Sequence, residues 1–123
     1  MPQLFKNNAA SYIDGAINST ATSISLPSGA GAKFPVTSGS DYFLATIVGL
    51  DTNGIENAWE IVKVTARSSD TLTVVRAQES TTALSWAHAS RIENRLTAAT
   101  TNTFTLASYA SVDDATALAI SLG

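Results

Sequence analysis

Residues 42–75, YFLATIVGLDTNGIENAWEIVKVTARSSDTLTVV, are the stretch that decides the fold. Residues 42–50 form an almost unbroken apolar run, rich in aromatic and β-branched side chains, which is typical of a central strand covered on both faces. The pair Asn53-Gly54 follows, and both residue types tolerate positive φ, which favours a hairpin turn. The stretch therefore predicts strands that fold back on one another.

The second half of this stretch predicts the clearest hairpin of the chain. Residues 58–65 (AWEIVKVT) and residues 72–75 (LTVV) read as two strands joined by a polar turn. Trp59 occupies an inward-type position, while the alternation of apolar and polar residues slips at Ile61-Val62, which indicates a bulge. Hence we expect Trp59 to be buried in the core or in a subunit interface.

The flanking regions extend the same pattern. Residues 22–26 (TSISL) alternate and then meet Pro-Ser-Gly, and residues 90–97 (SRIENRLT) alternate again. The chain of 123 residues is long enough to bury one core. We predict an all-β fold, a single compact antiparallel β-sandwich or barrel-like domain with extended terminal arms.

The predicted domain boundaries are an N-terminal arm at 1–10, a β domain at 11–98 and a C-terminal extension at 99–123. Little in the arm or in the Ala/Thr-rich residues 97–102 favours order. Within the extension, residues 103–106 (TFTL) predict a short strand. Residues 111–118 predict a helical turn, with a serine cap followed by two aspartates.

Composition narrows the class of function. Only 14% of the residues are charged, against about 25% in ordinary soluble domains, so copies of the chain repel one another weakly. The net charge is −3 and the seven basic residues are scattered, which argues against a nucleic-acid binder. The sequence has no cysteine, no visible signal peptide and no apolar run of membrane-spanning length. We expect synthesis in the cytoplasm and no membrane partner.

The residues for catalysis or cofactor binding are sparse. His88 is the only histidine, and its neighbour Ser85 lies in the same short segment, whereas catalytic pairs are usually assembled from distant segments. One histidine without cysteine does not make a zinc site, and no calcium-loop spacing is present. Gly29-x-Gly31 lacks the Lys-Ser/Thr of a phosphate loop. We expect no catalysis, metal, cofactor or small-molecule substrate.

The remaining candidate residues concern protein contacts. Trp59 and Trp86 are either ligand-stacking platforms or, as we favour, members of the core or a subunit interface, together with Phe43. Leu4 and Phe5 are apolar residues in a polar leader, and Lys6 helps to keep that leader soluble. A leader of this kind is expected to dock on a partner and to become ordered there.

An ordered series of blocks resembles a small β domain of tailed-phage virion proteins. The blocks are ISLPSGAGAKFP (24–35), DYF (41–43), EIVKVTAR (60–67), LTVVRAQE (72–79) and RLTA (95–98). That domain occurs at the start of tail-fibre and head-fibre chains and as short stand-alone virion proteins. The chain departs from the pattern at Ser80 and at Ala89-Ser90, where the family leads us to expect glycine and a Gly-Asp turn. The resemblance implies a role in particle structure and carries no catalytic residues.

The resemblance leaves three functions open. Because the sequence ends at Gly123, where a fibre would continue into a shaft, we favour a head-decoration, or cement, protein. It would form a homotrimer on the virion and bridge subunits of the major capsid protein. The alternatives are a tail, neck or fibre-anchoring adaptor and, from another class, a carbohydrate-binding module or small hydrolase that uses Trp59 or Trp86.

Overall fold

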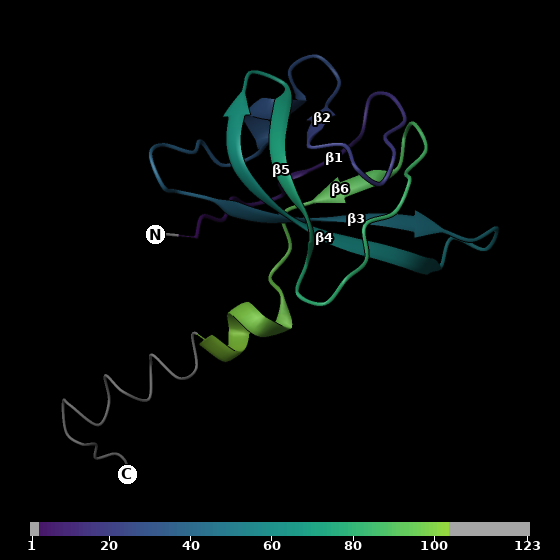
Figure 1. Cartoon of the computed structure of the whole chain (residues 1–123). Coiled ribbons are helices and arrows are strands. Elements are labelled where there is room, and N and C mark those ends of the chain that lie inside the picture. Colours follow the sequence, from purple (N-terminus) through teal and green to yellow (C-terminus); the bar gives the residue numbers. More distant parts are fainter. Residues whose placement is uncertain (1–2, 104–123) are drawn as a thin grey trace, which may run out of the picture.

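The fold is a single curled antiparallel sheet, as seen in a computed structural model that describes residues 3–103. Its strands follow the order β1-β6-β3-β4-β5-β2 and form a half-barrel (Figure 1). The elements are β1 (Ala10–Tyr12), β2 (Ser23–Ser25), the 3₁₀ turn η1 (Ala30–Lys33), β3 (Phe43–Leu50), β4 (Glu56–Ser68), β5 (Thr71–Gln78) and β6 (Arg91–Glu93). The predicted all-β class is confirmed, and of the two architectures the barrel-like one is correct.

The β3–β4 hairpin lies where the apolar run and the Asn53-Gly54 pair predict it. The Asp51 carboxylate shapes the turn, because its Oδ1 accepts hydrogen bonds from the backbone N–H groups of Asn53 at 2.8 Å and Ile55 at 2.9 Å. Of the Asn53-Gly54 pair, only Gly54, with φ of 80°, adopts the left-handed conformation. The loop is therefore longer than a two-residue turn, and glycine is needed at one position of the pair.

The β4–β5 hairpin is confirmed, including its irregularity. Ile61 pairs with Gln78 and Lys63 pairs with Val75, so the register shifts between these two pairs. This shift lies where the apolar–polar alternation slips in the sequence. A bulge of this kind increases the local twist, and it occurs where the sheet curls toward the core.

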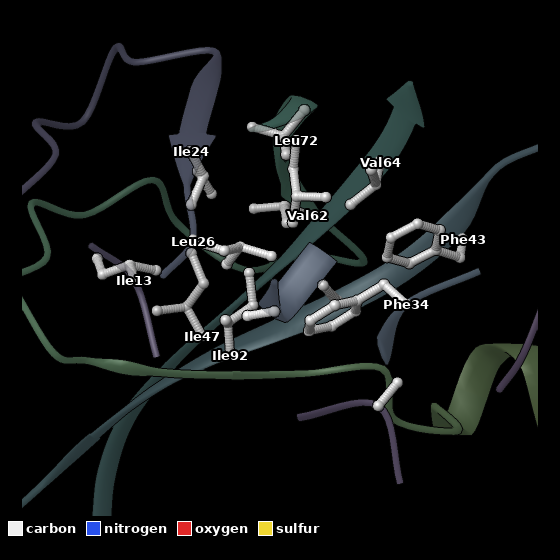
Figure 2. Packing of buried hydrophobic residues seen from close by; sticks show 14 of the residues in the cluster. Ile13, Ile24, Leu26, Phe34, Phe43, Ile47, Val62, Val64, Leu72 and Ile92 are labelled. Atoms are coloured by element: carbon white, nitrogen blue, oxygen red, sulfur yellow. The ribbon is translucent and has the colours of Figure 1, made fainter. Parts of the chain in front are cut away.

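The core fills the concave side of the curled sheet. Figure 2 shows apolar side chains from strands and loops that point toward one another. The side chains labelled there, all of them fully buried or nearly so, are Ile13, Ile24, Leu26, Phe34, Phe43, Ile47, Val62, Val64, Leu72 and Ile92. Phe34 and Phe43 stack with their ring centroids 5.9 Å apart. Both rings therefore join the loop before β3 to the sheet.

The turn η1 is fastened to the β4–β5 hairpin through two glycines. The Asp70 carboxylate accepts hydrogen bonds from the N–H groups of Gly31 at 2.8 Å and Gly29 at 3.1 Å. These bonds lower the pKa of Asp70. A Cβ at Gly31 would lie 1.9 Å from the carbonyl oxygen of Ser69. The Gly-x-Gly segment thus holds a carboxylate of its own chain at its amide groups.

The leader corrects the prediction of a free N-terminal arm. The backbone N–H of Leu4 donates to the Tyr42 carbonyl at 2.8 Å, and Gln3 forms a parallel bridge with Tyr42. Leu4 packs against the core, and Ala9 is buried. Residues 3–10 are therefore part of the domain, because their polar backbone groups and apolar side chains find partners along β3 and β6.

The segment after β6 is more ordered than its Ala/Thr-rich sequence predicts. Residues 98–103 are helical, and Thr97 and Thr100 are buried. The expected strand at 103–106 is wrong at Thr103, which is helical, and its other residues lie outside the described range, as does the predicted turn at 111–118. Within residues 3–103 no helix is long and apolar enough to cross a membrane.

Candidate interaction surface

Trp59 lies on the outer face of the sheet, which corrects its predicted position in the core. Its exposed fraction is 55%, whereas Glu60, Val62 and Val64 on the same strand are fully buried. Since side chains alternate between the two faces of a strand, burial of these three residues places Trp59 outside. The other half of the prediction, that Trp59 lies in a subunit interface, stays a prediction.

The burial of Glu60 sets this orientation, and a dense hydrogen-bond network satisfies its charge. The carboxylate receives two hydrogen bonds from the Arg76 guanidinium, at 2.7 and 2.9 Å, and one from the Trp86 indole N–H at 2.9 Å. The backbone N–H groups of Ala77 and Leu84 also donate to it. Burial alone would raise the pKa of Glu60, but these donors outweigh it and lower the pKa.

Trp59 lines a hollow on the outer face with a volume of about 470 Å³. Ile61 and Leu96 line the same hollow, and Leu96 is 60% exposed. Glu79 and Thr81, which follow β5, form another part of its wall. We refer to Trp59, Ile61 and Leu96 as the outer apolar patch. Its two exposed side chains, Trp59 and Leu96, present apolar area to solvent at this hollow.

Four of the charged residues around the outer apolar patch form ion pairs with one another. Arg95 binds the Glu56 carboxylate at 2.6 and 3.0 Å and binds Glu93 at 2.8 Å, while Arg91 binds the other oxygen of Glu93. The hydrogen bond from Arg95 lowers the pKa of Glu56, and the pKa of Arg95 is raised in turn. The patch is thus bordered by the Glu56–Arg95 ion pair and by Glu79, which has no ion-pair partner among residues 3–103, so it suits a partner surface without acidic side chains.

A second hollow, of about 660 Å³, is lined in part by Ala99 and Thr100, which follow the residues Thr97 and Ala98 that line the first. Phe5, Tyr42 and Lys63 line it, and the Lys63 ammonium lies 4.7 Å from the centre of the Tyr42 ring. Phe5, one of the predicted partner-binding residues, is 41% exposed. The two hollows share Glu79, whose carboxylate accepts a hydrogen bond from Thr97 at 2.8 Å.

The other two leader candidates are engaged within the domain. Leu4 is partly buried against the core. The Lys6 ammonium donates to the Ala32 carbonyl at 2.6 Å, and the Lys6 N–H donates to the Asn94 side chain at 3.1 Å. A docking leader would have to give up these contacts. Of the three residues, Phe5 alone presents a large apolar side chain to solvent.

The remaining candidates lie in the core and in a loop. Phe43 is fully buried and Trp86 is 6% exposed, so both lie in the core, one of the two positions expected for them. His88 is a loop residue with a side chain that is 60% exposed, and its Nδ1 accepts a hydrogen bond from the N–H of Gly15 at 2.9 Å. Residues 3–103 contain no cluster of three metal-ligating side chains.

The tip of the β3–β4 hairpin is a feature that the sequence patterns did not reveal. β3 pairs with β6 at residues 46–48 and β4 pairs with β5 from Ile61 onward, so the tip extends beyond both neighbours (Figure 1). Leu50 and Ile55 near the tip are 45% and 61% exposed. The extent of pairing could not be deduced from β4 itself, because it depends on where the partner strands end.

Comparison with known proteins adds no family assignment, since no protein-family model matches the chain and no curated protein matches it significantly.

Proposed function

We propose that this chain is a non-enzymatic structural protein of a tailed-phage particle, one that decorates the head and bridges subunits of the major capsid protein. One structural observation supports a binding role above all. The outer apolar patch exposes Trp59 and Leu96 beside the Glu56–Arg95 ion pair. Exposed apolar area of this kind usually marks a protein contact, and tryptophan is enriched among the residues that dominate such contacts.

The assignment to a phage particle is supported by the ordered blocks at 24–35, 41–43, 60–67, 72–79 and 95–98. The low fraction of charged residues, 14%, fits a protein that stands beside many copies of itself. We propose a homotrimer as the working unit. Weak contacts from each copy would then add through their effective concentration on the shell.

The test is to locate the chain on purified particles by electron cryomicroscopy. Head decoration predicts density over the capsid lattice in many copies, whereas a tail or neck adaptor predicts a small number at one vertex. Density confined to the tail would replace decoration by the adaptor function. Absence of the chain from the particle would overturn the virion assignment.

A matched pair of variants tests the role of the outer apolar patch. Trp59→Ala should weaken binding to particles grown without the chain by about tenfold or more, since truncation of a central tryptophan commonly has that effect. Val36→Ala is the control, because Val36 is an exposed apolar residue, at 68%, outside the residues that line the hollow. Glycan binding that disappears with Trp59→Ala would instead favour a carbohydrate-binding module.

A further inference from the structure

The first half of β4 has an open backbone edge beside the outer apolar patch. β4 runs from Glu56 to Ser68, but its pairing with β5 begins at Ile61. Before that point, β4 has a strand partner only on its β3 side within the described part of the chain. An edge of this kind exposes N–H and C=O groups to which a further strand can bind.

Hydrogen bonds at Ile61 show which backbone groups face the open edge. The Thr81 hydroxyl accepts from the Ile61 N–H at 3.1 Å, and the Ile61 carbonyl oxygen lies 3.4 Å from the same hydroxyl, so both groups point toward the β5 side. In an antiparallel strand this direction alternates from residue to residue. The N–H and C=O of Trp59 therefore point to the same side, whereas those of Ala58 and Glu60 point to β3.

Thr81 covers the edge of β4 at Ile61, and the covered part of this edge ends there. On the N-terminal side of Ile61, among residues 3–103, no hydrogen bond occupies the backbone N–H and C=O of Trp59 that point away from β3. The hollow of about 470 Å³ opens at this point, and it is lined by Trp59, Leu96 and Thr81 among others. Backbone groups that need a partner and a hollow that accepts an apolar side chain thus lie side by side.

We propose that the edge of β4 at residues 56–60 binds an extended strand of a partner protein on the phage particle. The strand pairs with the Trp59 backbone and places a bulky apolar side chain in the hollow. Its chemistry follows from the surroundings: Glu56 and Arg95 are already paired with each other, and the Glu79 carboxylate lines the hollow without an ion-pair partner among residues 3–103, so a strand without acidic side chains fits best. The proposal rests on the proposed virion function and names the partner of its binding surface.

Hydrogen exchange of the full chain tests the proposal. The free protein is compared with protein bound to phage particles that were assembled without it. Strand addition should slow exchange of the Trp59 amide by at least about tenfold. The amides of Ala58 and Glu60, which already bond to β3, should change little. This alternation distinguishes strand pairing from general shielding, which would slow all three amides together.

A second arm of the experiment uses two lysine variants of the same hairpin. Asn57→Lys places a charge beside the open edge and should weaken particle binding by about tenfold, as lysine blocks strand addition on natural edges. Thr52→Lys adds the same charge at the exposed tip and should stay within about twofold of the original affinity.

The outcomes separate the two proposals. A chain that binds particles while its Trp59 amide exchanges freely overturns the strand proposal and leaves the virion function standing. Protection of Trp59 in the purified protein alone, at high concentration, identifies a second copy as the occupant and overturns a partner's strand. Failure to bind particles at all overturns the virion function and this partner with it.

Discussion

Glu60 is the residue on which the orientation of β4 depends. Removing its charge by Glu60→Gln would leave the Arg76 guanidinium buried without a countercharge. We expect this change to lower the free energy of unfolding by about 3–5 kcal/mol, because breaking a buried ion pair leaves an uncompensated charge. Urea denaturation followed by circular dichroism measures it. The control is Glu93→Gln, on a more exposed ion pair, which should cost about 1 kcal/mol or less. Equal losses in the two variants would contradict a special role for Glu60.

Asp70 is expected to contribute to the loss of stability in acid. Its pKa in the folded protein lies below its ordinary value of 3.8, owing to hydrogen bonds from Gly31 and Gly29. A lowered pKa stabilises the fold at pH values above 3.8, and this contribution is lost as the pH falls through the folded-state pKa. Asp70→Asn should therefore be less stable than the original at neutral pH and should lose less stability on acidification. Urea midpoints measured from about pH 7 to about pH 2 decide this, and parallel curves for the two proteins would rule it out.

At the scale of elements, the approach of η1 to the β4–β5 turn allows no side chain at Gly31. Gly31→Ala should lower the free energy of unfolding by more than 2 kcal/mol, since the added Cβ would meet the Ser69 backbone at 1.9 Å. Gly39→Ala is the control, because Gly39 has φ of 60° and open space around it, so about 1 kcal/mol of backbone strain is expected. Thermal or urea unfolding measures both. A smaller loss at Gly31 than at Gly39 would mean that the turn can move away from η1.

The elements predicted from sequence are those whose signals are local. Residues 42–75 contain their own alternation and turn residues, and the structure forms β3, β4 and β5 there. The leader and residues 98–103 were not predicted, because their order comes from distant contacts such as those of Leu4 with Tyr42 and Thr97 with Glu79. The face of Trp59 was wrong for a similar reason. Burial of Glu60 requires Arg76, sixteen positions away, and alternation alone cannot supply that fact.

At the scale of the whole molecule, association is the property to measure. Because the chain is weakly charged and exposes the outer apolar patch, we expect it to form the proposed homotrimer in solution. Sedimentation at micromolar concentrations should show a species of three chains, and its mass should change little with added salt, because few charges repel. A monomer across that range would count against the homotrimer.

The Arg76 guanidinium donates five hydrogen bonds, and these have a consequence for the kinetics of folding. Besides Glu60, the guanidinium binds the carbonyls of Leu84, Asn18 and Ala21, the last two being 58 and 55 positions away in sequence. Loops that are so far apart in sequence come into contact late in folding, after the local hairpins have formed. Contacts that have not yet formed in the transition state of folding affect the unfolding rate and leave the folding rate nearly unchanged. Arg76→Met, measured by stopped-flow mixing, should therefore accelerate unfolding strongly while refolding proceeds at nearly its original rate. The arginine would then slow the unfolding of the half-barrel once it has formed.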